Sequence, residues 1–402
     1  MTEINIKIKK EYLKKYQNGY PLIDKDAFVN MPQSIQEGSV LNLVDSHNKF
    51  VAKGYYGRQN KGYGWVLSGS SLVKFDKAFF KQKIKNAIDY RADFFAAEDT
   101  TAFRVFNSTG DGVGGLSIDY FDGYYLITWY SLGIYSFKDM ILEALKECVD
   151  YKGIYHKRRF ENNGQYVEAR SDFVCGNVAP APLVIKENGI KFAIYLDDGA
   201  MVGIFLDQRE VRQTIRDKYA KDSVVLNTFS YTGAFSLYSA IGGAKQTVSV
   251  DLAKRSLAKT KEHFNLNAVA LDNHKILVED VFHYFKYAAR KELKFDLVIA
   301  DPPSFARSKK HTFSVAKDYK NLLKDIINIT AKGGVIVAST NYAGLKVEKF
   351  KGFIDKAFQE LGVEYKILQN FSLPKDFRVS KSFKEDDYLK VFFIKKLDVS
   401  VN

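Results

Sequence analysis

Four acidic residues follow short apolar runs in the second half of the chain, where carboxylates could bind a nucleoside or orient a base. The sharpest signal is the run that ends at Asp301 and continues as Pro302, Pro303, Ser304 and Phe305. Two prolines cannot continue a strand, so the chain must leave the sheet at Asp301 and form a stiff, extended lip. We expect Asp301 at the mouth of a site, although an Asp-Pro-Pro run could also do no more than end a strand.

Aromatic and basic residues follow this lip directly. Phe305 is followed by a run that contains Arg307 and Lys309. An acid, a prolyl platform, an aromatic ring and then positive charge suit a nucleotide target that is held beside a cofactor. We therefore predict that Pro302, Pro303, Phe305, Arg307 and Lys309 contact the substrate.

A turn of small polar residues lies between a predicted strand at 224–226 and a predicted helix. Gly233 permits close approach of the backbone, and the turn offers free N–H groups to a polar ligand. The repeated glycines of a dinucleotide fingerprint are missing. The residues of this turn that we expect to bind a cofactor are Asn227, Phe229, Ser230, Tyr231, Thr232 and Gly233.

Two further strand ends carry acids. Asp251 lies 24 residues after Asn227, where a carboxylate can accept both hydroxyls of a ribose. The next predicted strand ends at Glu279 and Asp280, and a carboxylate there can meet an adenine amino group. Each acid alone could equally cap a helix. Together with Asp301, Asp251 and Asp280 favour a nucleoside cofactor.

The second half of the chain alternates between buried strands and helices. This pattern predicts a doubly wound α/β sheet, parallel at least in its middle and with helices on both faces. The predicted strands are 224–226, 247–250, 275–278, 295–300 and 335–338. Ligands of such sheets bind at the carboxyl ends of the strands, which is where the residues named above lie.

The first half of the chain has a different pattern. Residues 1–72 contain short alternating strands with turn signals between them, which predicts a small β-barrel or β-roll. Ten basic and six acidic residues give this segment a charge of +4, and aromatic residues lie among them. The aromatic residues could bind RNA or form the core of the barrel. We expect residues 73–182 to form an α+β unit and residues 183–402 to form the domain that contains the doubly wound sheet.

Composition narrows the functional class. The 402 residues include 60 basic and 47 acidic side chains, a net charge of +13, which suits either a polyanionic partner such as nucleic acid or a lysine-rich solvated surface. Two cysteines, Cys148 and Cys175, provide no disulfide framework and no zinc-type spacing, so we expect no metal and a reducing compartment, the cytoplasm. No apolar run is long enough to span a bilayer. A homodimer is compatible with the sequence.

The motifs at 227–235, 251, 279–281 and 301–305 resemble those of class I S-adenosylmethionine-dependent methyltransferases. The run Phe-Leu-Asp-Gln-Arg at 205–209 is similar to a signature of the RlmI-type 23S ribosomal RNA methyltransferases. That resemblance implies a PUA-like RNA-binding domain, a central α+β domain and a methyltransferase domain, in that order. It also implies that Gln208 and Arg209 lie near the methionine end of the cofactor, although Arg209 could instead cap a helix or pair with Asp207.

One residue departs from the RlmI-type pattern. Members that make 5-methylcytosine have a catalytic cysteine at the position of Asn341, and residues 183–402 contain no cysteine. The sequence at 301–310 also resembles that of the N7-guanine methyltransferases of the wider group (RlmK type), which use no thiol. We expect Asp301 and Asn341 to orient the base, and we favour a thiol-free target such as guanine N7. The alternatives are a non-catalytic RNA-binding or ribosome-assembly factor, and a DNA methyltransferase.

Overall fold

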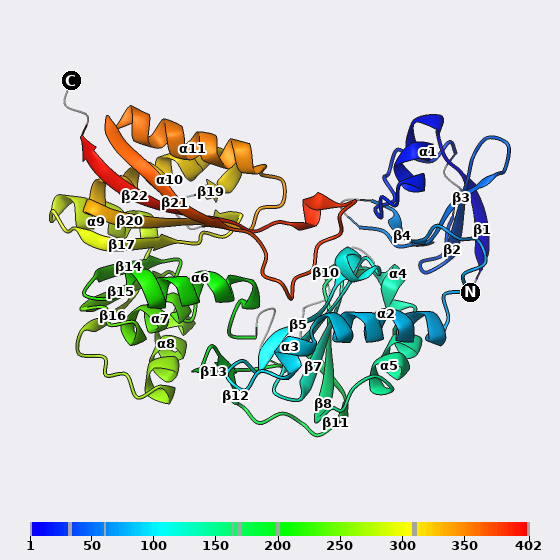
Figure 1. The fold of residues 1–402 in the computed structure, drawn as a ribbon, viewed down its shortest axis with the longest axis horizontal. Coiled ribbons are helices and arrows are strands. Elements are labelled where there is room, and N and C mark those ends of the chain that lie inside the picture. Colours follow the sequence, from blue (N-terminus) through cyan, green and yellow to red (C-terminus); the bar gives the residue numbers. More distant parts are fainter. Residues whose placement is uncertain are drawn as a thin grey trace. The chain divides into compact units, whose positions relative to one another are not determined.

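The computed structural model describes residues 2–30, 34–59, 62–162, 165–166, 171–197, 202–307 and 312–399. The chain forms two compact units (Figure 1). The first comprises Met1–Ile185, Ile194–Val202 and Lys375–Asp386, and the second comprises Lys186–Ala193, Gly203–Pro374 and Asp387–Asn402. The division into three domains at residues 72 and 182 stays a prediction.

The first unit begins with a four-stranded sheet in the order β1-β2-β3-β4. β1 and β2 are parallel, whereas β3 is antiparallel to both β2 and β4. The strands lie where the alternating runs predict them, and helix α1 follows β1. Their bounds are β1 Glu3–Lys7, α1 Lys10–Gln17, β2 Val40–Val44, β3 Phe50–Tyr56 and β4 Gly64–Ser68.

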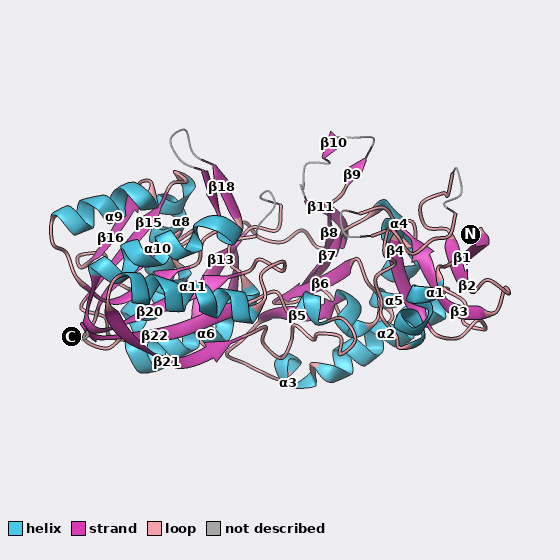
Figure 2. Cartoon of the chain, turned by 90° about the horizontal axis from the view of Figure 1, so that it is seen from above, coloured by secondary structure: helices cyan, strands magenta, loops and turns pink. Residues whose placement is uncertain are grey.

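The second sheet of this unit has the order β11-β8-β7-β6-β5, and the contacting helices α2 and α5 pack beside it (Figure 2). α2 begins after Asp76, whose side chain accepts a hydrogen bond from the Phe79 N–H. The bounds are α2 Lys77–Tyr90, α3 Ala92–Phe95, β5 Ala102–Asn107, β6 Leu116–Phe121, β7 Tyr124–Trp129, α4 Leu132–Tyr135, α5 Lys138–Lys146, β8 Gly153–Arg158 and β11 Ser171–Gly176, with a small hairpin of β9 Glu161–Asn162 and β10 Gln165–Tyr166.

These two sheets share one hydrophobic core. Tyr55 and Trp65 of the first sheet pack in the same buried cluster as Phe103 of the second. The Tyr55 hydroxyl donates to the Gly114 carbonyl at 2.7 Å, and a Cβ at Gly114 would come within 2.2 Å of the Trp65 ring. A larger residue at position 114 would therefore separate the sheets. Tyr16, Phe28 and Tyr56 lie instead in a second buried cluster, which belongs to the first sheet.

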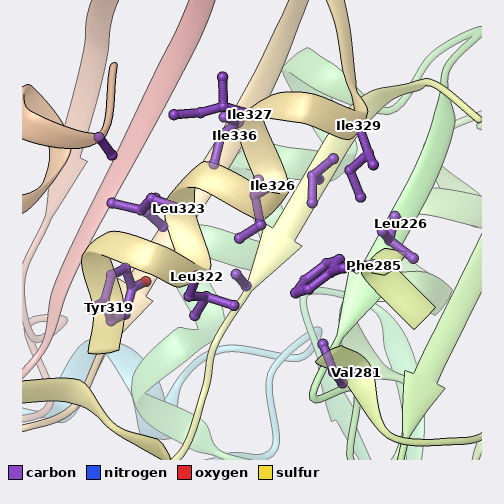
Figure 3. Packing of buried hydrophobic residues seen from close by; sticks show 14 of the residues in the cluster. Leu226, Val281, Phe285, Tyr319, Leu322, Leu323, Ile326, Ile327, Ile329 and Ile336 are labelled. Atoms are coloured by element: carbon purple, nitrogen blue, oxygen red, sulfur yellow. The ribbon is translucent and has the colours of Figure 1, made fainter. Parts of the chain in front are cut away.

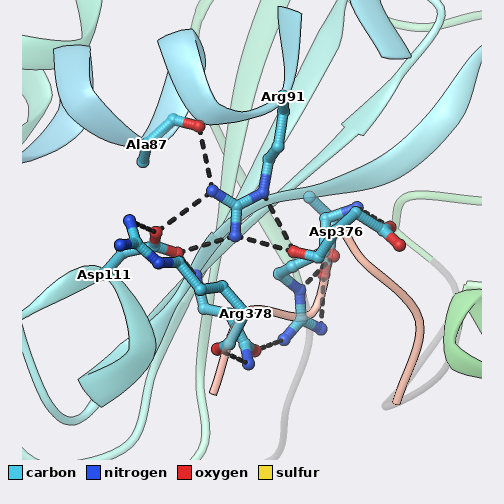
Figure 4. A network of polar contacts seen from close by, with 8 residues as sticks. Ala87, Arg91, Asp111, Asp376 and Arg378 are labelled. Carbon is cyan, nitrogen blue, oxygen red and sulfur yellow. Dashed lines mark hydrogen bonds and ion pairs between the residues drawn. The ribbon is translucent and has the colours of Figure 1, made fainter. Parts of the chain in front are cut away.

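A segment from near the end of the chain completes the first unit. Lys375–Asp386 is held there by Arg91, whose side chain is fully buried (Figure 4). The guanidinium donates to both oxygens of Asp111 at 3.1 and 2.7 Å, to the Asp376 carbonyl at 2.9 and 2.7 Å, and to the Ala87 carbonyl at 2.9 Å. One buried cation therefore joins the end of helix α2 to residues almost 300 positions later.

The second unit is built on a seven-stranded sheet in the order β16-β15-β14-β17-β20-β22-β21. The first five strands are parallel, while β22 is antiparallel to both β20 and β21. The predicted doubly wound α/β sheet is confirmed. The strands are β14 Val224–Thr228, β15 Gln246–Asp251, β16 His274–Val278, β17 Phe295–Ala300, β20 Thr330–Thr340, β21 Val363–Phe371 and β22 Lys390–Val399.

Helices cover both faces of this sheet (Figure 1). α9, α10 and α11 lie on one face, and Leu322, Leu323 and Ile326 of α10 pack there against Phe285 of α9 and the strands (Figure 3). α6, α7 and α8 lie on the other. The bounds are α6 Arg209–Thr214, α7 Ala234–Ile241, α8 Arg255–Leu266, α9 Val281–Arg290, α10 Val315–Ile329 and α11 Val347–Glu360; two short hairpins consist of β12 Leu183–Glu187 with β13 Ile190–Ile194 and β18 Phe305–Arg307 with β19 Thr312–Ser314.

Replacement of Arg91 should destabilise the first unit strongly. Arg91→Met removes the close ion pair of the buried Asp111 and leaves it only the longer ion pair with Arg378 at 3.8 Å among the described residues, so we expect a loss of about 3–5 kcal/mol in the free energy of unfolding. Both tryptophans of the chain, Trp65 and Trp129, lie in this unit, so tryptophan fluorescence during urea unfolding reports on it alone.

The control is Lys152→Met, which removes the exposed ion pair of Lys152 with Asp122. Exposed pairs contribute about 0–1 kcal/mol, so this variant should unfold almost as the parent does. Equal losses in the two variants would contradict the role assigned to Arg91.

Candidate functional site

The carboxyl ends of the five parallel strands lie at one edge of the sheet. Thr228 at the end of β14 is opposite Ala300 at the end of β17, and Asp251 at the end of β15 is opposite Val278 of β16. Ala300 is in turn opposite Ala338 of β20. The strand order reverses between β14 and β17, which is where doubly wound sheets bind their ligands.

Three residues of the turn after β14 have positive φ angles. Phe229, Tyr231 and Gly233 have φ values of +55°, +50° and +73°. A Cβ at Gly233 would come within 2.3 Å of the Thr260 side chain, so only glycine fits this position. The Ser230 hydroxyl is buried and has no hydrogen-bond partner among the described residues. The N–H groups of Ser230 and Gly233 bond to the Val250 and Ser230 carbonyls, and that of Tyr231 bonds to Asp251, so the expectation of free N–H groups is wrong at these three positions. The Ser230 hydroxyl is the polar group of the turn that remains for a ligand.

Asp251 connects this turn to the end of β15. One carboxylate oxygen accepts the Tyr231 N–H at 2.8 Å, and the other accepts the Ala253 N–H at 2.8 Å. Each oxygen retains a further lone pair that could accept a ribose hydroxyl. Leu252, the next residue, is 55% exposed although it is apolar. Its exposure beside a candidate ribose ligand suits the face of a base, and the sequence pattern did not single it out.

Three of the predicted residues have structural hydrogen bonds of their own. The Asp280 side chain caps α9, because it accepts the N–H groups of Phe282 and His283 at 2.9 and 3.2 Å. The Asn227 amide donates to the Ser236 hydroxyl at 3.0 Å in the interior. Thr232 donates to the Gly203 carbonyl at 2.7 Å. Contact of these residues with a cofactor stays a prediction.

A buried polar cluster surrounds Asp301. The Gln208 amide donates to the Ser339 hydroxyl at 2.9 Å, and both side chains hydrogen-bond the Asp301 carboxyl group. Burial raises the pKa of Asp301 from its ordinary value of 3.8 to about 6; hydrogen bonds from Ser339 and Gln208 oppose this rise and the nearby charge of Asp207 adds to it. Oδ1 of Asp301 and Oε1 of Gln208 are buried and have no hydrogen-bond partner within the described part of the chain.

The Phe-Leu-Asp-Gln-Arg segment that supplies Gln208 is fixed by a buried ion pair. Arg212 donates to both oxygens of Glu187 at 2.8 and 2.7 Å and to the Phe205 carbonyl at 2.7 Å. Arg209 is also buried, at the start of α6. Gln208 is therefore presented by a rigid turn rather than by a free loop.

The predicted substrate residues lie on two loops that are joined by a hydrogen bond. The Ser304 hydroxyl donates to Oδ1 of Asn341 at 2.9 Å, so the Asp-Pro-Pro lip and the end of β20 meet. Pro302 is buried, Pro303 is exposed and the Phe305 ring is 62% exposed. Arg307 is the last residue of β18, and Lys309 lies outside the described residues.

These residues fit S-adenosylmethionine. Oδ1 of Asp301, Oε1 of Gln208 and the Ser230 hydroxyl are buried polar atoms without a hydrogen-bond partner among the described residues, so they can bind a polar ligand. Asp251 offers lone pairs for hydroxyl groups. No three histidine, cysteine or acidic side chains gather at a possible metal site in the described ranges, and no helix there is long and apolar enough to cross a membrane.

Comparison with known proteins agrees with this site. Residues 154–351 match the S-adenosylmethionine-dependent methyltransferase family, and residues 6–69 match the PUA-like domain. YwbD of Bacillus subtilis, which carries the name of a ribosomal RNA large subunit methyltransferase, is 56% identical over 97% of this chain and 98% of its own. Ribosomal RNA large subunit methyltransferase I of Yersinia pseudotuberculosis is 28% identical over 93% of this chain and 94% of its own.

A solved structure is similar over almost the whole chain. The crystal structure of SMU.776, named as a methyltransferase and complexed with SAH, has a TM-score of 0.90 and 38% sequence identity, and the match covers 98% of this chain and 100% of that one. The resemblance drawn from the sequence motifs is confirmed, and so is S-adenosylmethionine as the cofactor.

Loss of the Asp251 carboxylate should weaken cofactor binding. Asp251→Ala removes the acceptor for a ribose and the anchor of the Tyr231 N–H, so we expect a loss of about 2–3 kcal/mol, or roughly 30–150-fold in affinity. Titration calorimetry with S-adenosylmethionine measures the cofactor affinity. Asp296→Ala is the matched control, because Asp296 also accepts a backbone N–H, that of Val224, at the opposite end of β14. Unchanged affinity in folded Asp251→Ala would refute the assignment.

The raised pKa of Asp301 predicts a pH-dependent stability. The folded state binds this proton more tightly than the unfolded state, so the stabilisation is complete below about pH 4 and is lost as the pH rises through 6. The variant Asp301→Asn has an amide in place of the carboxyl group, and this side chain stays uncharged at every pH. Relative to the parent, its stability should rise by about 2 kcal/mol between pH 4.5 and pH 8.

Urea unfolding followed by circular dichroism measures this difference. The control is Asp222→Asn, which changes an exposed carboxyl group of the same unit. Parallel stability profiles of the parent and Asp301→Asn over this pH range would show that the carboxyl group is not held in a desolvated state.

Proposed function

Because this chain belongs to the S-adenosylmethionine-dependent methyltransferases that carry a PUA-like domain, we propose that it methylates a base of the large-subunit ribosomal RNA. The names of the similar proteins support this substrate. The net charge of +13 favours a polyanionic partner, and the amino-terminal segment combines basic residues with a PUA-like match. A cytoplasmic location belongs to the same proposal.

The observation that carries the proposal is the proximity of two loops to one buried carboxyl group. Asp301 contacts Gln208 and Ser339 on one side, while the lip that follows it reaches Asn341 through Ser304. The bound cofactor supplies an electrophilic methyl group on a sulfonium. Catalysis then depends on holding the acceptor atom in line at about 3 Å and on excluding water, which a rigid and desolvated cluster favours.

We further propose that the acceptor is a nucleophilic ring nitrogen such as guanine N7. The C5 carbon of cytosine needs a thiolate that adds to C6, and the position of that thiol is Asn341 here. The guanine N7 lone pair attacks the methyl carbon directly, the carbon–sulfur bond breaks, and no proton leaves the base. Asn341 can orient the base by hydrogen bonds but cannot form a covalent adduct.

The two cysteines should be dispensable. Cys148 follows helix α5, and Cys175 lies in β11; both residues are in the first unit, and burial raises the pKa of Cys148. We expect Cys148→Ser/Cys175→Ser to retain methyl transfer to undermodified large-subunit ribosomal RNA within about three-fold of the parent rate, since each cysteine is partly buried and acts as a small hydrophobe.

The assay follows labelled methyl groups into ribosomal RNA, and nucleoside analysis then identifies the product. Double-stranded DNA and small-subunit RNA serve as comparison substrates. A product of 5-methylcytosine with complete loss of activity in the folded double variant would refute the thiol-free mechanism. Cofactor binding without transfer to any RNA would instead support a non-catalytic assembly factor.

A further inference from the structure

The turn after β20 holds an exposed aromatic ring on a fixed backbone. The Tyr342 N–H donates to the Thr340 hydroxyl at 3.2 Å, and its carbonyl accepts the Lys390 ammonium at 3.4 Å. Gly344 lies against the ring, since a Cβ there would come within 2.7 Å of the Tyr342 hydroxyl. The residue is nevertheless 36% exposed. The backbone of this tyrosine is thus fixed at both its N–H and its carbonyl group, while part of its side chain faces solvent.

Lys390 is the more unusual member of this arrangement. It is the first residue of β22, lies opposite Thr340 in the sheet and is buried. Its ammonium donates to the Tyr388 carbonyl at 3.0 Å as well as to that of Tyr342, and burial lowers its pKa. Burying an ammonium group costs free energy, and strand pairing needs only the backbone of this residue. The lysine side chain therefore serves the turn and not the sheet.

The same turn adjoins the substrate lip. Asn341, directly before Tyr342, accepts the Ser304 hydroxyl, and Ser304 directly precedes Phe305. The Phe305 ring is 62% exposed. Ser304 and Asn341 share one hydrogen bond, and each is followed in sequence by an exposed aromatic residue, Phe305 and Tyr342. Aromatic rings in such positions stack on unpaired bases, because every base has a π-face.

We propose that Tyr342 stacks on the target nucleotide and that Lys390 is the positioning residue that, together with the Leu345 N–H, holds the backbone carbonyl of Tyr342. This inference rests on the proposed function, since it presupposes an RNA base as acceptor. Stacking uses the ring face and not the hydroxyl, so phenylalanine should replace tyrosine. A base held by Tyr342 is brought to Asn341, the residue that orients it.

The test measures single-turnover methylation of undermodified large-subunit ribosomal RNA against RNA concentration, and S-adenosylmethionine affinity by calorimetry. Tyr342→Phe should stay within two-fold of the parent. Tyr342→Leu should raise the half-saturating RNA concentration about ten-fold or more and leave cofactor affinity unchanged. Tyr287→Leu, at an exposed tyrosine of α9, is the control and should change neither value.

Lys390→Met should resemble Tyr342→Leu, and Lys390→Arg should restore part of the loss. Because Lys390 acts through Tyr342, the double variant Lys390→Met/Tyr342→Leu should be no worse than either single variant. Lys396→Met is the matched control, because Lys396 lies on the same strand and burial also lowers its pKa. Its ammonium donates to the Ile327 carbonyl of α10 and to the Thr330 carbonyl at the opposite end of β20.

Normal RNA half-saturation in Tyr342→Leu would overturn the proposal, as would losses that add in the double variant or an equal loss in Lys396→Met. If Lys390→Met does not fold, the Tyr342 variants decide alone. Failure of the parent to methylate any RNA would refute the proposed function instead, so the two failures are distinguishable.

Discussion

A carboxyl group buried at the end of β17 sets the constraint on which the site depends. Asp301 is desolvated, and the hydrogen bonds that its carboxyl group accepts from Ser339 and Gln208 offset part of the free-energy cost of burying its charge. Gln208 comes from the turn before α6, and Ser339 comes from β20, whose carbonyl at that residue accepts the Tyr319 hydroxyl of α10 at 2.6 Å. Three separate segments are therefore fixed by the requirements of one group.

Hydrogen bonds to a carboxylate also fix the turn that is predicted to bind the cofactor. Asp251 is only partly buried, and both of its oxygens accept backbone N–H groups. Such bonds to a carboxylate orient the turn that begins with Phe229 and keep the residues of the turn in their left-handed conformations. The acid thus shapes the turn as well as offering lone pairs to a ligand.

The first unit includes a segment from near the carboxyl end of the chain, residues 375–386. Residues 375–386 lie between β21 and β22 in sequence, yet Arg91 binds Asp376 and Asp111 pairs with Arg378 within the first unit. Phe383 joins the same hydrophobic core as Trp65, and the two rings meet edge to face at 5.7 Å. Such non-local contacts close only after nearly the whole chain is present, which slows folding in comparison with a unit of local contacts.

The sequence alone determined the doubly wound sheet, its cofactor class and the strand ends that carry Asp251, Asp280 and Asp301. These features are local: apolar runs of strand length, a turn of small residues and two prolines act within a few positions of one another. Parallel strands then bring their carboxyl ends to one edge without further information. The absence of cysteine from residues 183–402 is likewise read directly from the sequence.

Only the tertiary structure decided which polar groups meet. The bonds of Gln208 to Ser339 and of Ser304 to Asn341 join residues 131 and 37 positions apart, and no periodic pattern signals such pairs. The capping role of Asp280, the buried bond of Asn227 and the place of residues 375–386 in the first unit also depend on packing. A residue type states what bonds a side chain can make, whereas its burial and its neighbours decide which of them it does make.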